Sequence, residues 1–303
     1  MATVLARTKE MTRDDWLAAR RVGIGSSDAA AVLGLDEYRS PLDVYLSKRG
    51  LLPEEPGNRF TEWGTRLEPL VADWFTAETG KKVRNRNAIL AHVERPYIVA
   101  NLDRTVVGEP AVLEIKTTSA WKRDEWEDGA IPLRVVVQVQ HQLMVTGDAY
   151  GYVAVLIGGN DPRWQRLDRD EALIEQMLAR YEAFWFGHVE AGVEPPPSAA
   201  SDAETMDRLY PQEEAGKSVL LPLGARATLE ALARAKADRM EAEAREKAAR
   251  AAVEALLGDA EIGMLPGIAG PVVTWKTQER KAHSVAASSF RKLNLRERVL
   301  SGK

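Results

Sequence analysis

Apolar residues at helical spacing dominate the first part of the chain. In residues 59–80, "RFTEWGTRLEPLVADWFTAETG", they recur every three or four positions, which predicts an amphipathic helix that ends at Gly80. Upstream, Thr12 or Asp14 can cap a helix that reaches Arg21. Two further short helices are expected, one after the Gly-Ser turn of "GIGSSDAAAVLGL" and one in "SPLDVYLSKRG".

From residue 83 to residue 118 the pattern changes to short runs that are typical of strands. The runs are "KKVRNRNAIL", "YIVANLDRTVV" and "AVLEIKTT", and "GEP" supplies a hairpin turn between the last two. "LRVVVQVQHQLMVTG" is predicted as a helix, "YGYVAVLIGG" as a strand, and "RWQRLDRDEALIEQMLARYEAFWFGHVEAG" ends in a long helix. This order predicts an α/β (α+β) core with a mixed central sheet flanked by helices.

Prolines and small residues in "VEPPPSAASDAE" predict a linker at residues 193–204. The linker would divide a core at 1–192 from a C-terminal extension at 205–303. In the extension, residues 225–257 predict a charged, Ala-rich helix suited to self-association or to carrying the hairpin and basic tail that follow.

Composition narrows the function classes. The chain has 303 residues, 45% of them hydrophobic and 28% charged, which is typical of a soluble protein. Because it has no cysteine, disulfides, thiolate zinc sites, iron–sulfur clusters and cysteine nucleophiles are excluded. It has no apolar run long enough to cross a membrane and no signal peptide, so we expect a cytoplasmic protein. The net charge of −4 means that any action on DNA must depend on local cations and bound metal.

The candidate chemistry centres on the sequence Leu113-Glu114-Ile115-Lys116. In a strand, Glu114 and Lys116 share one face, and a hairpin turn would bring Asp103 opposite Glu114. Two adjacent carboxylates suit a hard divalent cation such as Mg²⁺, and Glu68 on the amphipathic helix is the best third carboxylate. The alternative is an ordinary ion pair on a half-exposed strand.

These residues together resemble the PD-(D/E)xK nuclease core. The similarity is closest to the YqaJ-type viral recombinases, which are similar to lambda exonuclease. It rests on Asp103, the Glu114–Lys116 stretch and "VQVQHQLMVTG", and also on "RRVGIGSSDAAAVLGLDEYRSPLDVYLSKRG" and "EWGTRLEPLVADWFTAETG". It extends from Trp16 to Ile157, and Leu102 stands where the family's motif has its proline.

The resemblance implies roles for named residues. A Mg²⁺ ion, with Mn²⁺ as a possible substitute, would be bound by Asp103, Glu114, the Ile115 carbonyl and Glu68. Lys116 would position the attacking water, and Gln138 would line the site. A 5′ phosphate would be held by Arg20 and Ser27, with Arg21 as a rival for the arginine.

The implied function is a metal-dependent DNA exonuclease, encoded by a phage or prophage and acting in the bacterial cytoplasm. It would resect double-stranded ends from 5′ to 3′ and leave 3′ single strands for a single-strand annealing protein. A homo-oligomer is plausible because similar proteins form rings around DNA. Two alternatives stay open: a repair or restriction-type endonuclease on the same core, and a DNA-end-binding protein with a vestigial site.

Several other side chains could either pack in the protein or contact DNA. His141 is more consistent with packing than with DNA contact, and the basic run in "KKVRNRN" suits phosphates and a solvated strand edge equally. Trp63, Trp74 and Phe75 are expected in the core. Trp121 and Trp126 are better placed to meet a DNA end.

Overall fold

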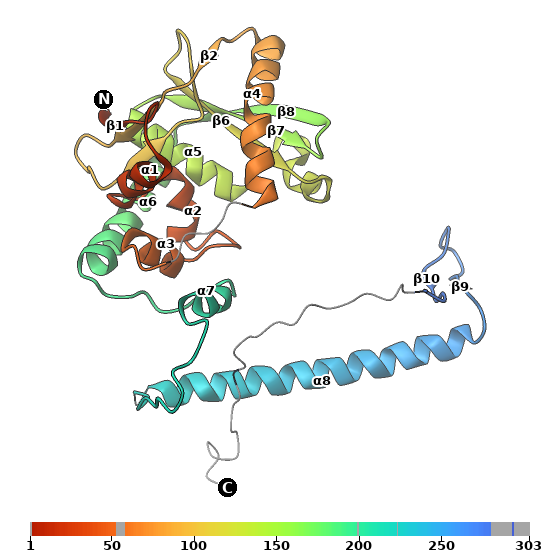
Figure 1. The fold of residues 1–303 in the computed structure, drawn as a ribbon. Helices are drawn as coiled ribbons and strands as arrows, with labels where there is room; N and C mark the ends of the chain where they lie inside the picture. The colour runs from red at the N-terminus through yellow and green to blue at the C-terminus, as the bar shows by residue number, and fades with distance from the viewer. Residues whose placement is uncertain (1, 53–57, 199, 223, 280–292, 294–303) are drawn as a thin grey trace. The chain divides into compact units, whose positions relative to one another are not determined.

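The computed structural model describes residues 2–52, 58–198, 200–222, 224–279 and 293. The chain forms two compact units, Met1–Tyr210 and Pro211–Lys303 (Figure 1).

The predicted linker at 193–204 lies within the first unit. Its last residues begin helix α7 (Asp202–Leu209), which is held on α3 (Pro41–Lys48). The Ser40 hydroxyl donates to Asp202, and the Thr205 hydroxyl donates to Asp43. The division of the chain therefore falls after Tyr210, because these buried hydrogen bonds tie the segment after the prolines to the core.

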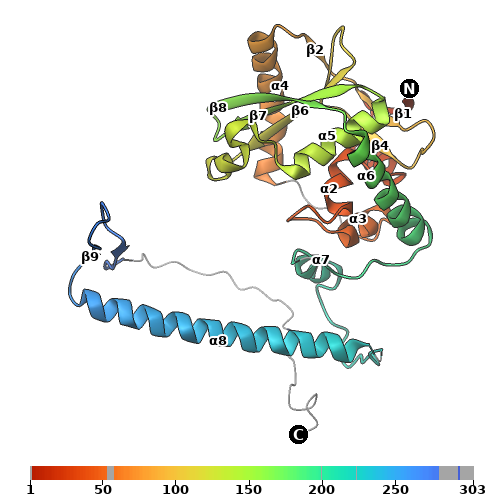
Figure 2. The same cartoon turned by 180° about the vertical axis from the view of Figure 1, so that it is seen from behind.

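The first unit is built on a five-stranded mixed sheet with the order β2-β5-β6-β7-β8. Its strands are Val83–Arg84 (β2), Arg104–Val106 (β5), Ala111–Thr118 (β6), Tyr150–Ile157 (β7) and Asp161–Asp168 (β8). β6 and β7 run parallel, whereas the other pairs are antiparallel. Helix α4 (Arg59–Thr79) covers one face of the sheet and α5 (Leu133–Thr146) the other (Figures 1 and 2).

The alternation of side chains along β6 assigns its residues to the two faces. Leu113 and Ile115 pack with Phe75 of α4, whereas Val112 packs with Val139 of α5. The expected core positions Phe75 and Trp74 do face the sheet, Phe75 fully buried and Trp74 partly so.

Close approach of α5 to the sheet depends on one glycine. A Cβ added to Gly151 of β7 would lie 2.8 Å from a Val112 methyl group and 2.9 Å from a Val139 methyl group. Only glycine lets the helix that carries Gln138 pack this tightly over β6 and β7.

A second sheet has three strands in the order β1-β3-β4. It consists of β1 (Thr3–Arg7), β3 (Ala88–Ala91) and β4 (Val99–Asn101). β1 was not predicted, because its side chains are mostly exposed and show no buried alternation. β8 was not predicted either. It is an edge strand rich in polar residues, and the helical pattern of the residues that follow it is stronger.

The N-terminal helices agree with their predicted caps. Thr12, not Asp14, caps α1 (Arg13–Arg21), since the Thr12 hydroxyl accepts from the Asp15 amide at 3.2 Å. Ser40 caps α3 in the same way. Between them lie a 3₁₀ turn (η1, Ser26–Asp28) and the short α2 (Ala29–Val32). After β8, α6 (Glu171–Phe184) continues into a π-helical turn (η3, Trp185–Glu190).

The second unit contains the predicted long helix and hairpin. Helix α8 spans Ala225–Leu257, and β9 (Ile262–Gly263) pairs with β10 (Val273–Thr274). The predicted basic tail lies outside the described residues, Leu293 excepted. Within the part of the chain that the structure describes, no helix is both long and apolar enough to cross a membrane.

Candidate active site

The structure brings Asp103 and Glu114 side by side. In the β5–β6 hairpin Arg104 pairs with Leu113, and continuing this antiparallel register by one residue places Asp103 opposite Glu114. The backbone amide of Ile115 donates to Asp103 Oδ2 at 2.8 Å. This hydrogen bond fixes the Asp103 carboxylate against β6, as the hairpin prediction required.

Glu114 is the centre of a buried polar cluster. Its side chain is 3% exposed, and Glu114 Oε1 lies 2.7 Å from Lys116 Nζ. Gln138 Nε2 donates to the same oxygen at 2.6 Å, and Gln142 Nε2 donates to Glu114 Oε2 at 2.6 Å. Lys116 also donates to Gln138 Oε1 at 2.9 Å. Both carboxylate oxygens therefore have hydrogen-bond donors, which is what a buried carboxylate requires.

Gln142 was not singled out from the sequence. It follows Gln138 by one helical turn in "QVQHQ", and this spacing of four is the signal that could have identified it. Both amides face β6 from α5, since positions four apart lie on one side of a helix, and each amide donates to Glu114.

The surroundings raise the pKa of both Lys116 and Asp103, but for different reasons. Burial lowers the pKa of Lys116, but Glu114 and then Asp103 outweigh burial, so the net pKa is raised. Lys116 is thus an ammonium at neutral pH. Burial, and then repulsion from Glu114, raises the pKa of Asp103 to about 8. Two carboxylates in this position are costly without a positive ion between them.

Glu68 is not brought together with Glu114. Its helix lies on the Leu113 face of the sheet, and Glu68 Oε1 forms an ion pair with Arg104. Glu68 and Asp103 do line one pocket of about 400 Å³, together with Arg104. Among the described residues, no three acidic or histidine side chains lie close enough to hold a metal ion.

Asp103 and Glu114 nevertheless fit a hard divalent cation. Mg²⁺ is commonly held by one or two carboxylates and keeps several waters. A cation at these two groups would remove the repulsion that raises the pKa of Asp103. The residues that would hold it are Asp103, Glu114 and the Ile115 carbonyl, whose residue is already fixed by its bond to Asp103.

The structure also brings Arg20 and Ser27 together. Arg20 Nη2 donates to Ser27 Oγ at 2.5 Å, and its guanidinium lies 4.5 Å from the centre of the Trp16 ring. Arg21 points elsewhere, with its guanidinium near Gly50. Of the two rival arginines, Arg20 is the one beside the serine.

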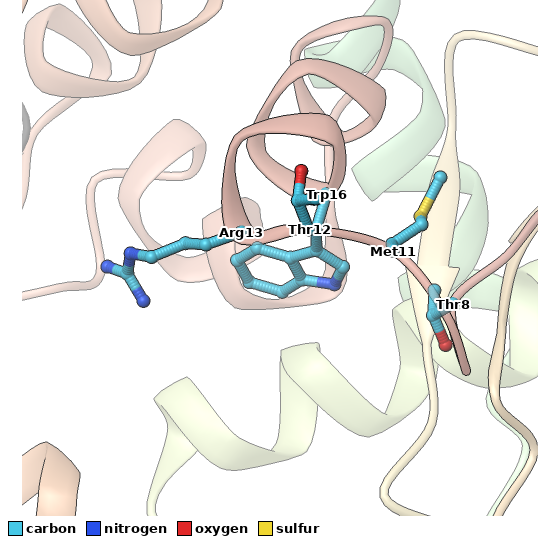
Figure 3. Close-up of a pocket in the computed structure, with 5 residues that line it drawn as sticks. All are labelled: Thr8, Met11, Thr12, Arg13 and Trp16. Carbon is cyan, nitrogen blue, oxygen red and sulfur yellow. The ribbon is translucent and has the colours of Figure 1, made fainter.

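A shallow pocket of about 430 Å³ lies at the start of α1 (Figure 3). It is lined by Thr8, Met11, Thr12, Arg13 and Trp16. Thr8 also lines the pocket that contains Glu68 and Asp103. The two pockets therefore have Thr8 in common.

His141 is a core residue. It is fully buried, and its ring nitrogens lie 3.0 Å from the Tyr181 hydroxyl and 2.8 Å from the Val99 carbonyl oxygen. Burial lowers the pKa of His141 to about 4.

The lowered pKa of His141 predicts that the stability of the protein depends on pH. In the unfolded chain His141 takes up a proton near pH 6.5, whereas in the folded chain it does so only near pH 4. The free energy of unfolding should therefore fall by about 3 kcal/mol as the pH is lowered from 6.5 to 4. Urea unfolding at pH 7 and pH 4.5, followed by tryptophan fluorescence, measures the loss. His141→Gln should reduce it, whereas His188→Gln, at a half-buried histidine, should not. An equal loss in all three proteins contradicts the assignment.

Two expectations for tryptophans are wrong. Trp63 is 56% exposed and not in the core, because it lies on the side of α4 that faces away from the sheet. Trp126 is 4% exposed and packs in the main core, so it cannot meet a DNA end without unfolding. Trp121, at 95% exposed, remains available for such a contact.

The basic run "KKVRNRN" divides between two environments. Lys81 forms an ion pair with Glu109 at 2.6 Å, whereas Arg86 lines the same pocket as Glu68 and Asp103. The run is thus part strand edge and part pocket wall.

Comparison with known proteins places these features in a family. The model of the YqaJ-like viral recombinase domain matches residues 15–149. The uncharacterized protein YqaJ of Bacillus subtilis (strain 168) is 40% identical over 268 residues, which cover 87% of this chain and 84% of that protein. The chain belongs to the YqaJ-like viral recombinase family. The YqaJ-like segment contains every candidate residue from Arg20 to Gln142.

Solved structures agree on the fold. An alkaline exonuclease, LHK-Exo from Laribacter hongkongensis, matches with a TM-score of 0.51 and 23% identity over 60% of this chain and 94% of that chain. Its complex with dAMP matches with the same TM-score and 24% identity. The predicted fold, a mixed central sheet flanked by helices, is confirmed, and it is shared with this alkaline exonuclease.

Proposed function

We propose that this YqaJ-like chain is a metal-dependent DNA exonuclease of the phage or prophage recombination type. The observation that carries the proposal is the placement of Asp103, Glu114 and Lys116 on one face of the β5–β6 hairpin. The family match and the fold shared with an alkaline exonuclease support it.

Each residue of the site has a distinct task in phosphodiester hydrolysis. Asp103 and Glu114, with the Ile115 carbonyl, would hold Mg²⁺ or Mn²⁺, which when bound activates a water and stabilises charge on the leaving oxygen. Lys116, held charged beside Glu114, orients the attacking water and offsets negative charge that develops on the phosphate.

The helix α5 keeps these groups in place. Gln138 bridges Glu114 and Lys116, and Gln142 fixes the other oxygen of Glu114. Pre-organisation of this kind matters because a misplacement of the reacting groups by about 1 Å can cost about 100-fold in rate.

The finer assignments follow the family resemblance. Arg20 and Ser27 would hold the 5′ phosphate of a double-stranded end, since a guanidinium and a hydroxyl at hydrogen-bond distance offer donors to its oxygens. The enzyme would then resect from 5′ to 3′ and leave 3′ single strands for an annealing protein. We place this activity in the bacterial cytoplasm, in a homo-oligomer.

The proposal is tested with 5′-phosphorylated linear duplex DNA. We expect release of nucleotides with Mg²⁺ and none with EDTA, and protection when phosphorothioates block the 5′ end but not the 3′ end. A closed circular duplex should survive. Efficient cutting of the circle would favour the endonuclease, and tight binding of ends without cleavage by any divalent ion would favour the vestigial site.

A further inference from the structure

We infer that Arg39 is a second cation that binds the DNA-end phosphate and that the buried Asp28 positions the residues of this phosphate site. The inference rests on the proposed function and deepens it, because it adds residues to the phosphate site that neither the family match nor the comparisons assign. The ligand class is a terminal phosphate monoester on DNA.

Asp28 is the hub of a set of cations drawn from three segments. Its side chain is 3% exposed and lies 2.6 Å from Lys48 Nζ, measured from Oδ2. Arg39 Nη1 donates to Asp28 Oδ1 at 3.0 Å. The Gly25 amide donates to Oδ2 at 2.9 Å, which fixes the turn that carries Ser27.

Lys48 links this hub to the end of α1. It is 4% exposed, and its ammonium donates to the Arg20 carbonyl oxygen at 2.9 Å in addition to its ion pair with Asp28. The backbone of Arg20 is therefore tied to Asp28 through one lysine. The side chain of Arg20 reaches the exposed Ser27 at 2.5 Å.

Three cations lie around one buried carboxylate. One carboxylate, Asp28, is surrounded by Arg20, Arg39 and Lys48. These cations hold the pKa of Asp28 far below its usual range although burial opposes them, and burial, with a contribution from Arg39, lowers the pKa of Arg20. Partly desolvated positive charge of this kind favours the binding of an anion at its exposed side.

Two other carboxylates act on Arg39, but both have their own partners. Asp36 Oδ1 accepts from the backbone amides of Tyr38 and Arg39, and Asp43 accepts from the Ser40 amide and the Thr205 hydroxyl. Their charge offsets part of the positive charge on Arg39, but their hydrogen bonds hold them at a turn and at the start of α3, and Arg39 keeps donors that a ligand can bind.

Exposure indicates which members can reach a ligand. Lys48 and Asp28 are enclosed, whereas the Arg39 side chain is 36% exposed and Ser27 lies at the surface. Arg39 can thus bind a phosphate oxygen while it stays bonded to Asp28, since a guanidinium has several donors in a fixed plane. Asp28 and Lys48 act as positioning residues and do not touch the ligand.

The experiment uses the full chain in EDTA, so that binding is read without cleavage. Affinity is measured by fluorescence anisotropy for two blunt duplexes that differ only in a 5′ phosphate or a 5′ hydroxyl. We expect the wild-type protein to prefer the phosphate, and Arg39→Gln to reduce the preference about tenfold, the value of one charge-assisted hydrogen bond. Arg39→Lys should restore part of it, since the charge returns without the planar fork.

Arg95→Gln is the matched control. The Arg95 side chain is also 36% exposed and also has a carboxylate neighbour, Glu94 at 3.5 Å, but it lies outside the cluster. Its preference should equal that of the wild-type protein. A purely structural Arg39 would lower affinity for both duplexes alike and leave the ratio unchanged.

Asp28→Asn tests the positioning role. It should abolish the preference for phosphate while leaving the affinity for the hydroxyl duplex nearly the same. Should this buried variant fail to fold, judged by circular dichroism, Arg39→Gln alone decides. The inference is overturned if the wild-type protein shows no preference, or if Arg39→Gln retains it. Cleavage with Mg²⁺ is scored separately, so a protein that grips phosphate through Arg39 but cuts nothing refutes the proposed function and not this inference.

Discussion

Replacement of Lys116 by alanine is expected to lower the rate of DNA cleavage by about 10²–10⁴-fold and to leave DNA binding nearly unchanged. The ammonium lies 2.7 Å from Glu114 Oε1 and 2.9 Å from Gln138 Oε1, within the site. It would orient water and offset charge in the transition state, so its loss affects the chemical step. Single-turnover cleavage of 5′-phosphorylated duplex with Mg²⁺ measures the rate, and anisotropy in EDTA measures binding.

Lys217→Ala serves as the control for Lys116→Ala. Lys217 is 66% exposed and pairs with Glu214 three residues earlier, so we expect wild-type rates. Equal activity in Lys116→Ala and the wild-type protein would show that this lysine is an ordinary strand residue. A parallel loss of DNA affinity would show instead that it serves in binding.

Asp103→Asn is expected to abolish cleavage and, at the same time, to stabilise the metal-free protein. Asparagine can still accept from the Ile115 amide, but it carries no charge next to Glu114. Because burial and then Glu114 raise the pKa of Asp103, an ionised carboxylate here lowers the free energy of unfolding. Thermal unfolding in EDTA at pH 8 should therefore shift upwards by about 5–10 °C.

The matched variant is Asp124→Asn, at an exposed aspartate of the segment that follows β6. It should change neither the unfolding temperature nor the cleavage rate. A less stable Asp103→Asn protein would mean that the carboxylate is a structural group. Full activity in that variant would remove Asp103 from the site.

Much of the site could be predicted because it depends on local spacing. Side chains alternate along a strand, so the two positions that separate Glu114 and Lys116 are enough to put them on one face. The hairpin turn after Val106 then fixes Asp103 opposite Glu114, and the apolar periods of α4 and α5 give both helices with their glycine ends.

Positions that depend on long-range packing could not be predicted. Which face α4 covers is decided by Phe75 and Val71 against Leu113, and this choice puts Glu68 beside Arg104 rather than Glu114. Trp126 looked like a surface residue because its neighbours are polar, yet the main core takes it in. Neither the position of Glu68 nor the burial of Trp126 can be recognised from the residues next to it in the sequence.

The amino-acid sequence by itself determined the strands, helices and charge pairs whose partners lie within one hairpin or one helical turn. Tertiary structure alone decided the contacts between distant segments. Gln142 donates to Glu114, Lys48 and Arg39 pair with Asp28, and α7 packs on α3. The reason is that local spacing sets which way a side chain points, whereas its partner depends on how buried apolar faces of remote elements pack, and that is a property of the whole core.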